Sequence, residues 1–484
     1  MPTTVHRNLL LTGDTLFPVS QGPTSSSDET HSVPMLGYDD SDTEYPIDVY
    51  YRYIHPAHPF LLPRRLFLQN RSIFPDHLKN AMCFIASHHL ANGSSEVYEM
   101  KSNFIFDPTI PDDGFKVQSL ILVTLVSYAR FERDKGTRAL TTAIDLALRL
   151  GLNSSDFAIG QDSVFQESWR RTWWELYTIT GLISLIAGLN LRLSQPPQMK
   201  LPTHCEEYET GQGFHVKTVQ DMQQRFTEET NFKWSSFAYR IEAMRILSNV
   251  LELAMSPQPQ ADAVNASISS FLLSLPEEKR EGMKDDGETD EVMSCALMIV
   301  HLASICLHLP RSSLAGIRGF KTVCGNDRGK VVAEESKVHH RAALRSAKAL
   351  SDLITSRTTL RTLSPCFSCA IAFAAAVQLA ECLLNKSPQA QILKEYVQLE
   401  LSALNVLGET WPIALVVRSQ LAQFSREVLG YRIQPPATEE NCQEAMSSQM
   451  ASDPTISDEP WLQDLISEDL DFSADGFLFA GPNQ

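Results

Sequence analysis

One 25-residue stretch constrains the fold of this chain more than any other. It is FQESWRRTWWELYTITGLISLIAGL, at positions 165–189. Side chains recur in it at steps of four and three along a mostly apolar seam, which is the spacing of one face of an α-helix. The seam is formed by Phe165, Trp169, Trp173, Leu176, Thr180, Ile183 and Ala187. From Tyr177 onward nearly every side is apolar, so we expect this helix to be buried among other helices.

The RRTWW motif of this stretch could also bind a nucleic acid, with arginines on phosphates and rings stacked on bases. However, adjacent tryptophans project about 100° apart around a helix, so the pair cannot form one stacking platform. The spacing of Glu167, Arg171 and Glu175 predicts a local charge ladder. Arg170 lies one turn before Trp174 and can place its guanidinium on that ring. The pattern therefore favours a packed core helix over a nucleic-acid contact.

Helical periodicity extends over most of the chain, whereas alternating strand patterns are hard to find. At 137–153, Gly151 is a candidate C-terminal cap. The apolar face expected there consists of Leu140, Ile144, Ala147 and Leu148. Further helices are expected at 115–131, 218–255, 262–274, 291–308, 332–356, 365–385, 388–409 and 411–428. These patterns predict an all-α fold.

We expect three regions along the chain. Residues 1–44 are rich in Ser, Thr, Asp and Pro, and we expect this segment to be disordered. Residues 45–430 carry the helical patterns, and we expect one large multi-helix domain there. Residues 431–484 return to polar, acidic sequence and form a disordered tail.

The charge of the chain is concentrated in that tail. The net charge is −17, and residues 433–484 hold 11 of the 58 acidic residues but no Lys or Arg. Such a balance argues against a large non-specific grip on nucleic acid. The nine scattered cysteines suggest free thiols in a reducing compartment. The most apolar run, at 369–384, is Ala-rich and contains Gln378 and Glu381, so we expect a buried helix and no membrane partner.

Motifs for metal binding or catalysis are weak in this sequence. Cys366 and Cys369 form the only C-x-x-C, no second pair completes a zinc site, and buried thiols are expected. KDDGETDE at 284–291 is similar to the aspartate-rich magnesium motif of all-α prenyl and terpene synthases, but Gly287 interrupts it. Catalytic Ser, zinc-protease and phosphate-loop motifs are absent. We expect no catalytic residue, cofactor or metal and no enzyme, with an all-α enzyme of prenyl-transfer or lyase type and a helical adaptor as alternatives.

The stretch at 165–189 resembles the signature helix of the fungal-specific transcription factor domain, the middle homology region of binuclear zinc cluster regulators. The family pattern is Arg-Arg-x-Trp-Trp, then Leu-Tyr, then a Gly near the helix end. It is matched by Arg170, Arg171, Trp173, Trp174, Leu176, Tyr177 and Gly188. Thr180 and Gly181 stand where the family usually has Asp-Arg, and Gly188-Leu189-Asn190 stands where it often has Gly-Arg-Pro.

Three more blocks resemble the same domain in the same order. DVYYRYIHPAHPFL at 48–61 is similar to its beginning, and 117–153 is similar to its paired helices. VLGETWPIALVVRSQL at 406–421 is similar to its Trp-Pro-x-Ala helix. The first of these blocks is matched by Tyr50, Tyr51, His55, Pro56, Pro59, Phe60 and Leu61. The resemblance therefore covers about residues 45 to 430.

The resemblance implies a transcription regulator in the nucleus of a fungus, specific to one pathway, with a secondary-metabolite gene cluster as one expected target. Most relatives begin with a six-cysteine zinc cluster that binds DNA, yet residues 1–82 contain no cysteine. Either this sequence lacks that module, or the protein regulates without touching DNA itself. We therefore expect no zinc cofactor and no direct DNA contact. We also expect either a homodimer or a complex with a DNA-binding partner protein.

The acidic tail resembles an activation segment. DEPWLQDLISEDLDFSADGFLFA at 458–480 interleaves acids with large apolar residues, a composition found in such segments. We expect the acids to repel one another and keep the apolar groups exposed, ready to bind as a short helix in a groove of a coactivator or of the general transcription machinery. The proposed anchors are Trp461, Leu462, Leu465, Ile466, Leu470 and Phe472. A plain solubilising tail is the alternative.

Overall fold

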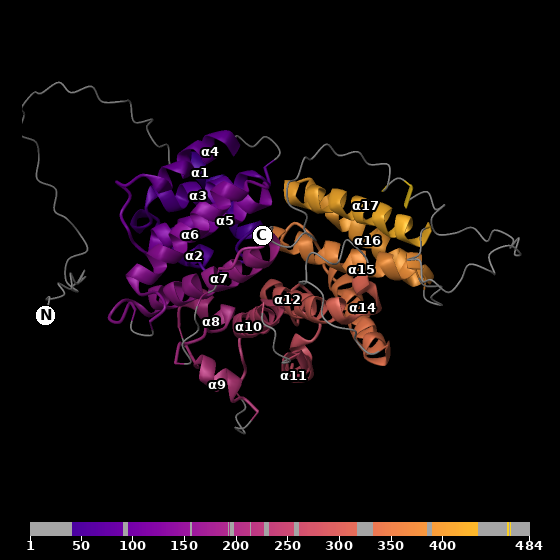
Figure 1. Ribbon diagram of the computed structural model, residues 1–484. Helices are drawn as coiled ribbons and strands as arrows, with labels where there is room; N and C mark the ends of the chain where they lie inside the picture. The colour runs from indigo at the N-terminus through magenta and orange to yellow at the C-terminus, as the bar shows by residue number, and fades with distance from the viewer. Residues whose placement is uncertain are drawn as a thin grey trace, which may run out of the picture. The chain divides into compact units, whose positions relative to one another are not determined.

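A computed structural model gives the three-dimensional structure of the chain (Figure 1). It describes residues 41–90, 95–154, 157–191, 193, 198–212, 214–226, 232–255, 261–316, 333–384, 390–433, 462, 463 and 465. These described residues belong to one compact unit. They contain sixteen α-helices and no strand, only two isolated bridges, Lys200–Thr218 and Met283–Thr289. The predicted all-α fold is confirmed. The expected disordered segment at 1–44 is wrong at its end, because α1 begins at Ser41, and residues 1–40 lie outside the described residues.

The sixteen helices of the described residues follow one another along the chain. The first eight are α1 (Ser41–Tyr53), α2 (Arg64–Gln69), α3 (Asp76–Ser87), α4 (Ser95–Asn103), α5 (Gly114–Ala129), α6 (Arg133–Leu150), α7 (Ser163–Ala187) and α8 (Cys205–Thr210). The remaining ones are α9 (Val219–Gln223), α10 (Ser236–Met255), α11 (Ala261–Leu273), α12 (Glu291–His308), α14 (Ala333–Thr355), α15 (Ser368–Leu384), α16 (Ala390–Gly408) and α17 (Pro412–Ile433).

Helices α5, α7, α12 and α15 form the middle of the packing. Helix α5 packs on α3 and α6, and α12 packs on α10 and α14. Helix α15 packs on α14, α16 and α17. Helix α7 contacts α5 and α6, which precede it in the chain, and α10, which follows it (Figure 1). It therefore links the first helices of the fold to the later ones.

Local sequence signals set both ends of α7. The Asp162 side chain accepts a hydrogen bond from the backbone N–H of Val164 at 2.9 Å, which caps the first turn. Gly188 ends the helix with φ 65°, a left-handed conformation that costs glycine little. Between Glu167 and Thr180 every side chain except Arg170 is buried. The predicted buried core helix is thus confirmed, and its burial extends over charged residues as well.

Two details of the predicted helices differ from the structure. Leu148 is 44% exposed, because the buried stripe of α6 runs instead through Ala139, Leu140, Ala143, Leu146 and Ala147. The expected helix at 218–255 is divided into α9 and α10, and the hydroxyl of Ser235 accepts the backbone N–H of Ala238 at 3.1 Å where α10 begins. The predicted cap at Gly151 is confirmed, with φ 79°.

Two described segments are long and apolar enough to cross a membrane by composition, Glu291–Arg311 and Pro365–Cys382. Both are 94% buried inside the protein. Their apolar character is therefore accounted for by core packing, and the buried helix predicted around 369–384 is confirmed.

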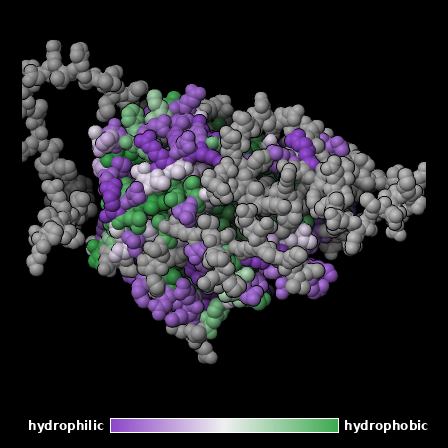
Figure 2. Space-filling model, in the orientation of Figure 1, coloured by the Kyte–Doolittle hydropathy of each residue, from purple (hydrophilic) through white to green (hydrophobic). Residues whose placement is uncertain are grey.

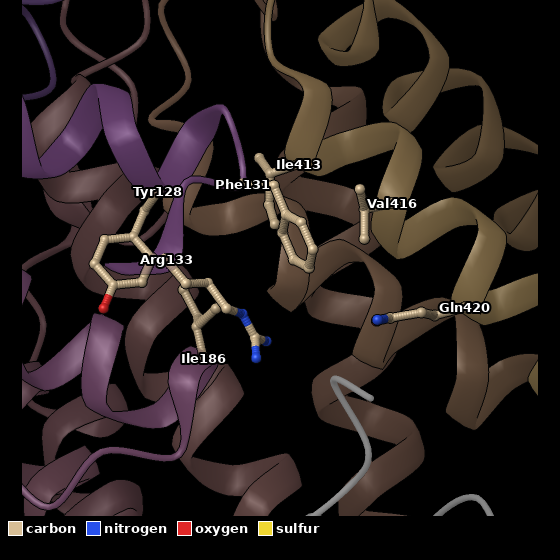
Figure 3. Close-up of a pocket in the computed structure, with 7 residues that line it drawn as sticks. All are labelled: Tyr128, Phe131, Arg133, Ile186, Ile413, Val416 and Gln420. Atoms are coloured by element: carbon tan, nitrogen blue, oxygen red, sulfur yellow. The ribbon is translucent and has the colours of Figure 1, made fainter. Parts of the chain in front are cut away.

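The beginning of α17 packs against earlier parts of the fold at two places. Trp411, just before α17, is 1% exposed and stacks on His88 at a centroid distance of 5.4 Å. Phe131, in the left-handed conformation at φ 64°, lies with Ile186 opposite Ile413 and Val416 (Figure 3). The cavity left between these side chains is only about 10 Å³, room for one water molecule.

Candidate functional site

A proline-rich loop at 54–62 connects α1 to α2 and forms one wall of the site. Pro56 and Pro59 have no backbone N–H, so the loop cannot continue as a helix, and its carbonyl groups need other donors. Helices α7 and α10 supply them. The three bonds run from Arg240 Nη1 to the Ala57 carbonyl (2.7 Å), from Arg171 Nη1 to the Pro59 carbonyl (3.0 Å) and from Ser168 Oγ to the Phe60 carbonyl (3.1 Å).

Arg171 is completely buried on α7, with partners on every part of its guanidinium. Its Nε donates to Glu167 Oε1 at 2.9 Å, and its Nη2 donates to the Thr203 carbonyl at 2.9 Å. The group also lies over the ring of Tyr208, with Cζ 4.1 Å from the centroid. An arginine enclosed in this way fixes the fold around it and cannot reach a phosphate of a nucleic acid.

Glu175 is the second buried charge of α7 and has two basic partners. His58 Nδ1 lies 2.6 Å from Glu175 Oε1, and the fully buried Arg240 donates to Glu175 Oε2. Burial raises the pKa of Glu175, but Arg240 and His58 outweigh it and hold that pKa below its usual range. The carboxylate therefore stays ionised and ties the proline-rich loop, α7 and α10 together.

Glu167 completes the network one turn earlier. It accepts from Arg170 and Arg171 together, and its Oε1 also accepts the backbone N–H of Thr203 at 2.9 Å. The predicted Glu167–Arg171 step of the charge ladder is confirmed. The expected contact of Arg170 with the ring of Trp174 is replaced by this ion pair, and the indole N–H of Trp174 donates to the Lys200 carbonyl at 2.9 Å. Of the two arginines, Arg171 is the one that lies over rings.

The remaining signature residues lie in or beside the same network. Tyr51 donates from its hydroxyl to the Leu62 carbonyl at 2.7 Å, which fixes the far end of the proline-rich loop. Trp173 and Tyr177 are 0% and 4% exposed and pack in the core. Burial, with Arg171 and His58 nearby, lowers the pKa of His55 to about 3, so its imidazole is neutral. Pro56, His55, Tyr51 and the α7 residues are therefore brought together, whereas Gly188 acts separately as the helix cap.

Gly181 explains one departure from the family pattern. A Cβ built on this residue would lie 2.4 Å from Met244 Cε of α10. The missing side chain therefore lets α10 approach α7 closely. The arginine of the usual pattern would not fit at this position without a shift of the Met244 side chain.

The residues considered for metal binding and catalysis have other roles. Cys366 and Cys369 are 7% and 2% exposed, and burial raises the pKa of Cys366 to about 12, so it stays a neutral thiol. Asp285 and Asp286 lie exposed on the turn before α12, whereas Asp290 caps that helix by accepting the backbone N–H of Met293 at 3.0 Å. The described residues hold no group of three or more side chains placed to bind a metal ion.

The proposed activation segment is described at only two of its six anchors. Leu462 and Leu465 are 0% and 1% exposed and belong to the same hydrophobic core as the helices. The expectation that the apolar groups of the tail stay exposed is wrong for these two leucines, because packing against the domain covers them. Trp461, Ile466, Leu470 and Phe472 lie outside the described residues.

Two comparisons with known proteins found a match that covers the site. The sequence profile described as Fungal specific transcription factor domain matches residues 47–280. That range holds the proline-rich loop and the whole buried network. The chain is also similar to the C6 finger domain transcription factor iacK of Pestalotiopsis fici, with 28% identity over 437 residues. No solved structure matches the chain.

The similarity to the Pestalotiopsis fici protein covers 85% of this chain but only 64% of that protein's length. The match at 47–280 ends before α12, whereas the compact unit continues through α17. Within the match, the residues that carry the family pattern are those that bury the charges of α7 and hold the proline-rich loop. Residues 47–280 of this chain are therefore similar to the fungal-specific transcription factor domain.

Proposed function

We propose that the chain is a transcription regulator, specific to one pathway in a fungus, that works in the nucleus through a helical regulatory domain and an acidic activation tail. The observation that carries the proposal is the family match at 47–280, whose signature residues form the buried network of α7. The similarity to a protein named a C6 finger domain transcription factor supports the same role. A secondary-metabolite gene cluster is the target that we propose.

The buried network has no part in contacting DNA under this proposal. Arg171 and Glu175 are fully buried, so neither can reach a phosphate. DNA would therefore be reached through a DNA-binding partner protein or through a zinc cluster that lies outside this sequence. At about 0.15 M salt, where long-range charge effects are screened, the purified chain should bind promoter DNA no better than random DNA. Tight sequence-specific binding would contradict this part of the proposal.

The tail would activate by binding a coactivator or the general transcription machinery. The test is a fusion of residues 433–484 to a heterologous DNA-binding domain, with reporter output as the measurement. Alanine at Trp461, Leu465 and Phe472 should reduce the output. Alanine at Gln443, Ser447 and Gln449 removes side chains of the same tail without touching an anchor and should leave it unchanged. Output no higher than that of the DNA-binding domain alone would refute the activation role.

The burial of Leu462 and Leu465 allows a second reporter comparison. The same anchors cannot lie in the core of the domain and in a coactivator groove at once. A fusion of the whole chain should therefore give less reporter output than a fusion of the tail alone, at equal protein level. Equal output from the two fusions would show that the domain does not compete for the tail.

A further inference from the structure

A cavity lies beside the first turns of α7, outside the buried network. Its volume is about 210 Å³, against about 10 Å³ for each of two other cavities of the described residues. Ligands of drug size occupy roughly 300–1,000 Å³, so this space suits a smaller organic molecule. Neither of the two smaller cavities holds more than a water molecule. The size difference singles out this cavity as a site for a ligand.

The walls of the cavity are aromatic and apolar. Trp169 of α7 and Phe157 of the preceding loop stand edge to face, with ring centroids 6.5 Å apart and planes at 83°. Leu152 and Met199 add aliphatic surface, and Ile159 at the rim is 71% exposed. Figure 2 shows hydrophobic residues gathered on the side of the view where α2, α6 and α7 lie in Figure 1. A flat apolar body can therefore be covered on several sides.

The polar part of the cavity is positively charged. Arg170 lines it, and Arg170 and Arg171 share the single carboxylate of Glu167, which leaves one positive charge uncompensated. Lys200, also in the lining, forms no ion pair with the described residues. These cations stand out in a chain whose net charge is −17. A ligand with a negatively charged group would be drawn to this end of the cavity.

The segment that carries Lys200 is held in place by hydrogen bonds. The Lys200 carbonyl accepts the indole N–H of Trp174, and the Met199 carbonyl accepts the backbone N–H of Val219 at 2.9 Å. On the other side, the indole N–H of Trp169 donates to Gln161 Oε1 at 2.9 Å. Both walls are therefore positioned before any ligand arrives, which lowers the entropy lost on binding.

We propose that this cavity is a binding site for a small aromatic carboxylate, with the ring against Phe157 and Trp169 and the carboxylate against Arg170 and Lys200. The site joins α7 to the segment at 198–200, so an occupied cavity would tighten the contact between them. The inference goes beyond the proposed transcriptional role and does not depend on it.

The test uses the purified full chain and 2-naphthoate as the probe, with calorimetry or ligand-observed NMR as the measurement. A probe of this size should bind with a Kd of about 0.1–1 mM. The uncharged 2-naphthylmethanol should bind more weakly. Substitution Lys200→Gln should weaken 2-naphthoate about two- to fivefold, as expected for one exposed ion pair, and should leave 2-naphthylmethanol unchanged.

Two further variants separate the site from other effects. Lys284→Gln removes the same charge from an exposed loop that does not line the cavity and should leave the affinity for 2-naphthoate unchanged. Ser154→Trp fills the cavity and should abolish binding of both probes, and its melting temperature shows whether the fold is kept.

Three results would overturn the proposal. They are no saturable binding of 2-naphthoate up to about 5 mM, unchanged binding by a folded Ser154→Trp, or equal binding by Lys200→Gln and the wild type. None of these results bears on reporter activation, so a failure here is distinguishable from a failure of the transcriptional role.

Discussion

Replacing Glu175 with glutamine tests whether the buried network holds the domain together. The substitution keeps the size of the side chain but removes its charge. In the folded protein this charge faces His58, at 2.6 Å, and Arg240, whose side chain is 2% exposed. Glutamine would leave the Arg240 guanidinium charged and without its carboxylate in the interior, where water cannot replace the lost partner.

The expected cost follows from that burial. Removing one partner of a buried ion pair destabilises a protein by about 3–5 kcal/mol. For a domain larger than 150 residues, 1 kcal/mol corresponds to a change in melting temperature of about 2 °C. We therefore expect Glu175→Gln to lower the melting temperature by about 6–10 °C. The loss of the Arg240–Ala57 contact, at 2.7 Å, would follow if the guanidinium moves toward water.

Thermal unfolding followed by tryptophan fluorescence measures this effect, because Trp173 and Trp174 lie in the same helix. Glu409→Gln is the matched control, since Glu409 is exposed and should cost no more than about 0.5 kcal/mol. The double variant Glu175→Gln, Arg240→Met should be more stable than the sum of the single effects predicts, by about 0.5–3 kcal/mol. A melting temperature equal to that of the control, or strictly additive effects, would refute the reasoning.

Three further predictions concern other parts of the fold. Burial raises the pKa of Glu400, and its hydrogen bond from Ser351 offsets this only in part. The wild type should therefore lose stability as the pH rises from the ordinary carboxyl pKa toward the raised one, by at most about 1.4 kcal/mol per pH unit. Glu400→Gln should remove that slope, and melting temperatures from about pH 5 to pH 8 that keep a constant difference would contradict this. Gly181→Val should cost about 1–3 kcal/mol in urea unfolding because its Cβ meets Met244, whereas alanine should cost less, and equal costs would speak against the steric explanation. Alanine at Leu462 and Leu465 should speed cleavage of the tail by thermolysin several-fold, and an unchanged rate would argue that their burial does not protect the tail.

The seam of α7 was predictable from the sequence, and the partners of its charges were not. Steps of three and four placed Trp169, Trp173 and Ile183 on one face, and the structure buries all three. The ladder interpretation correctly paired Glu167 with Arg171, because such pairs depend only on helix geometry. Glu175 was expected to continue the ladder. It pairs instead with His58 and Arg240, which lie 117 and 65 positions away in the chain.

Long-range pairs of this kind depend on how helices that are distant in the chain cross in space. No local pattern in a single sequence shows that crossing. One signal in the sequence did point to them. The prolines at 56 and 59 leave carbonyl groups of the loop without local donors, and buried arginines are the side chains best able to supply several donors at once. The boundary between α9 and α10 was missed for a related reason. A helical pattern across 218–255 does not show that the hydroxyl of Ser235 starts a new helix.

The two buried leucines of the tail also bear on how easily the protein could change state. Full burial of Leu462 and Leu465 is worth about 3–6 kcal/mol together. Fixing the backbone of the three described residues, 462, 463 and 465, costs about 3–6 kcal/mol. These opposing amounts are nearly equal, so the docked and released forms of the segment should differ by little in free energy.

An equilibrium between two forms of nearly equal free energy responds to small changes in free energy. A partner that prefers the released form by about 1.4 kcal/mol changes the ratio of the two forms tenfold. The ion pairs of α7 are different, since opening them would expose uncompensated charges at a cost of several kcal/mol. The domain therefore combines a rigid centre with one segment that a partner preferring the released form would displace from the core.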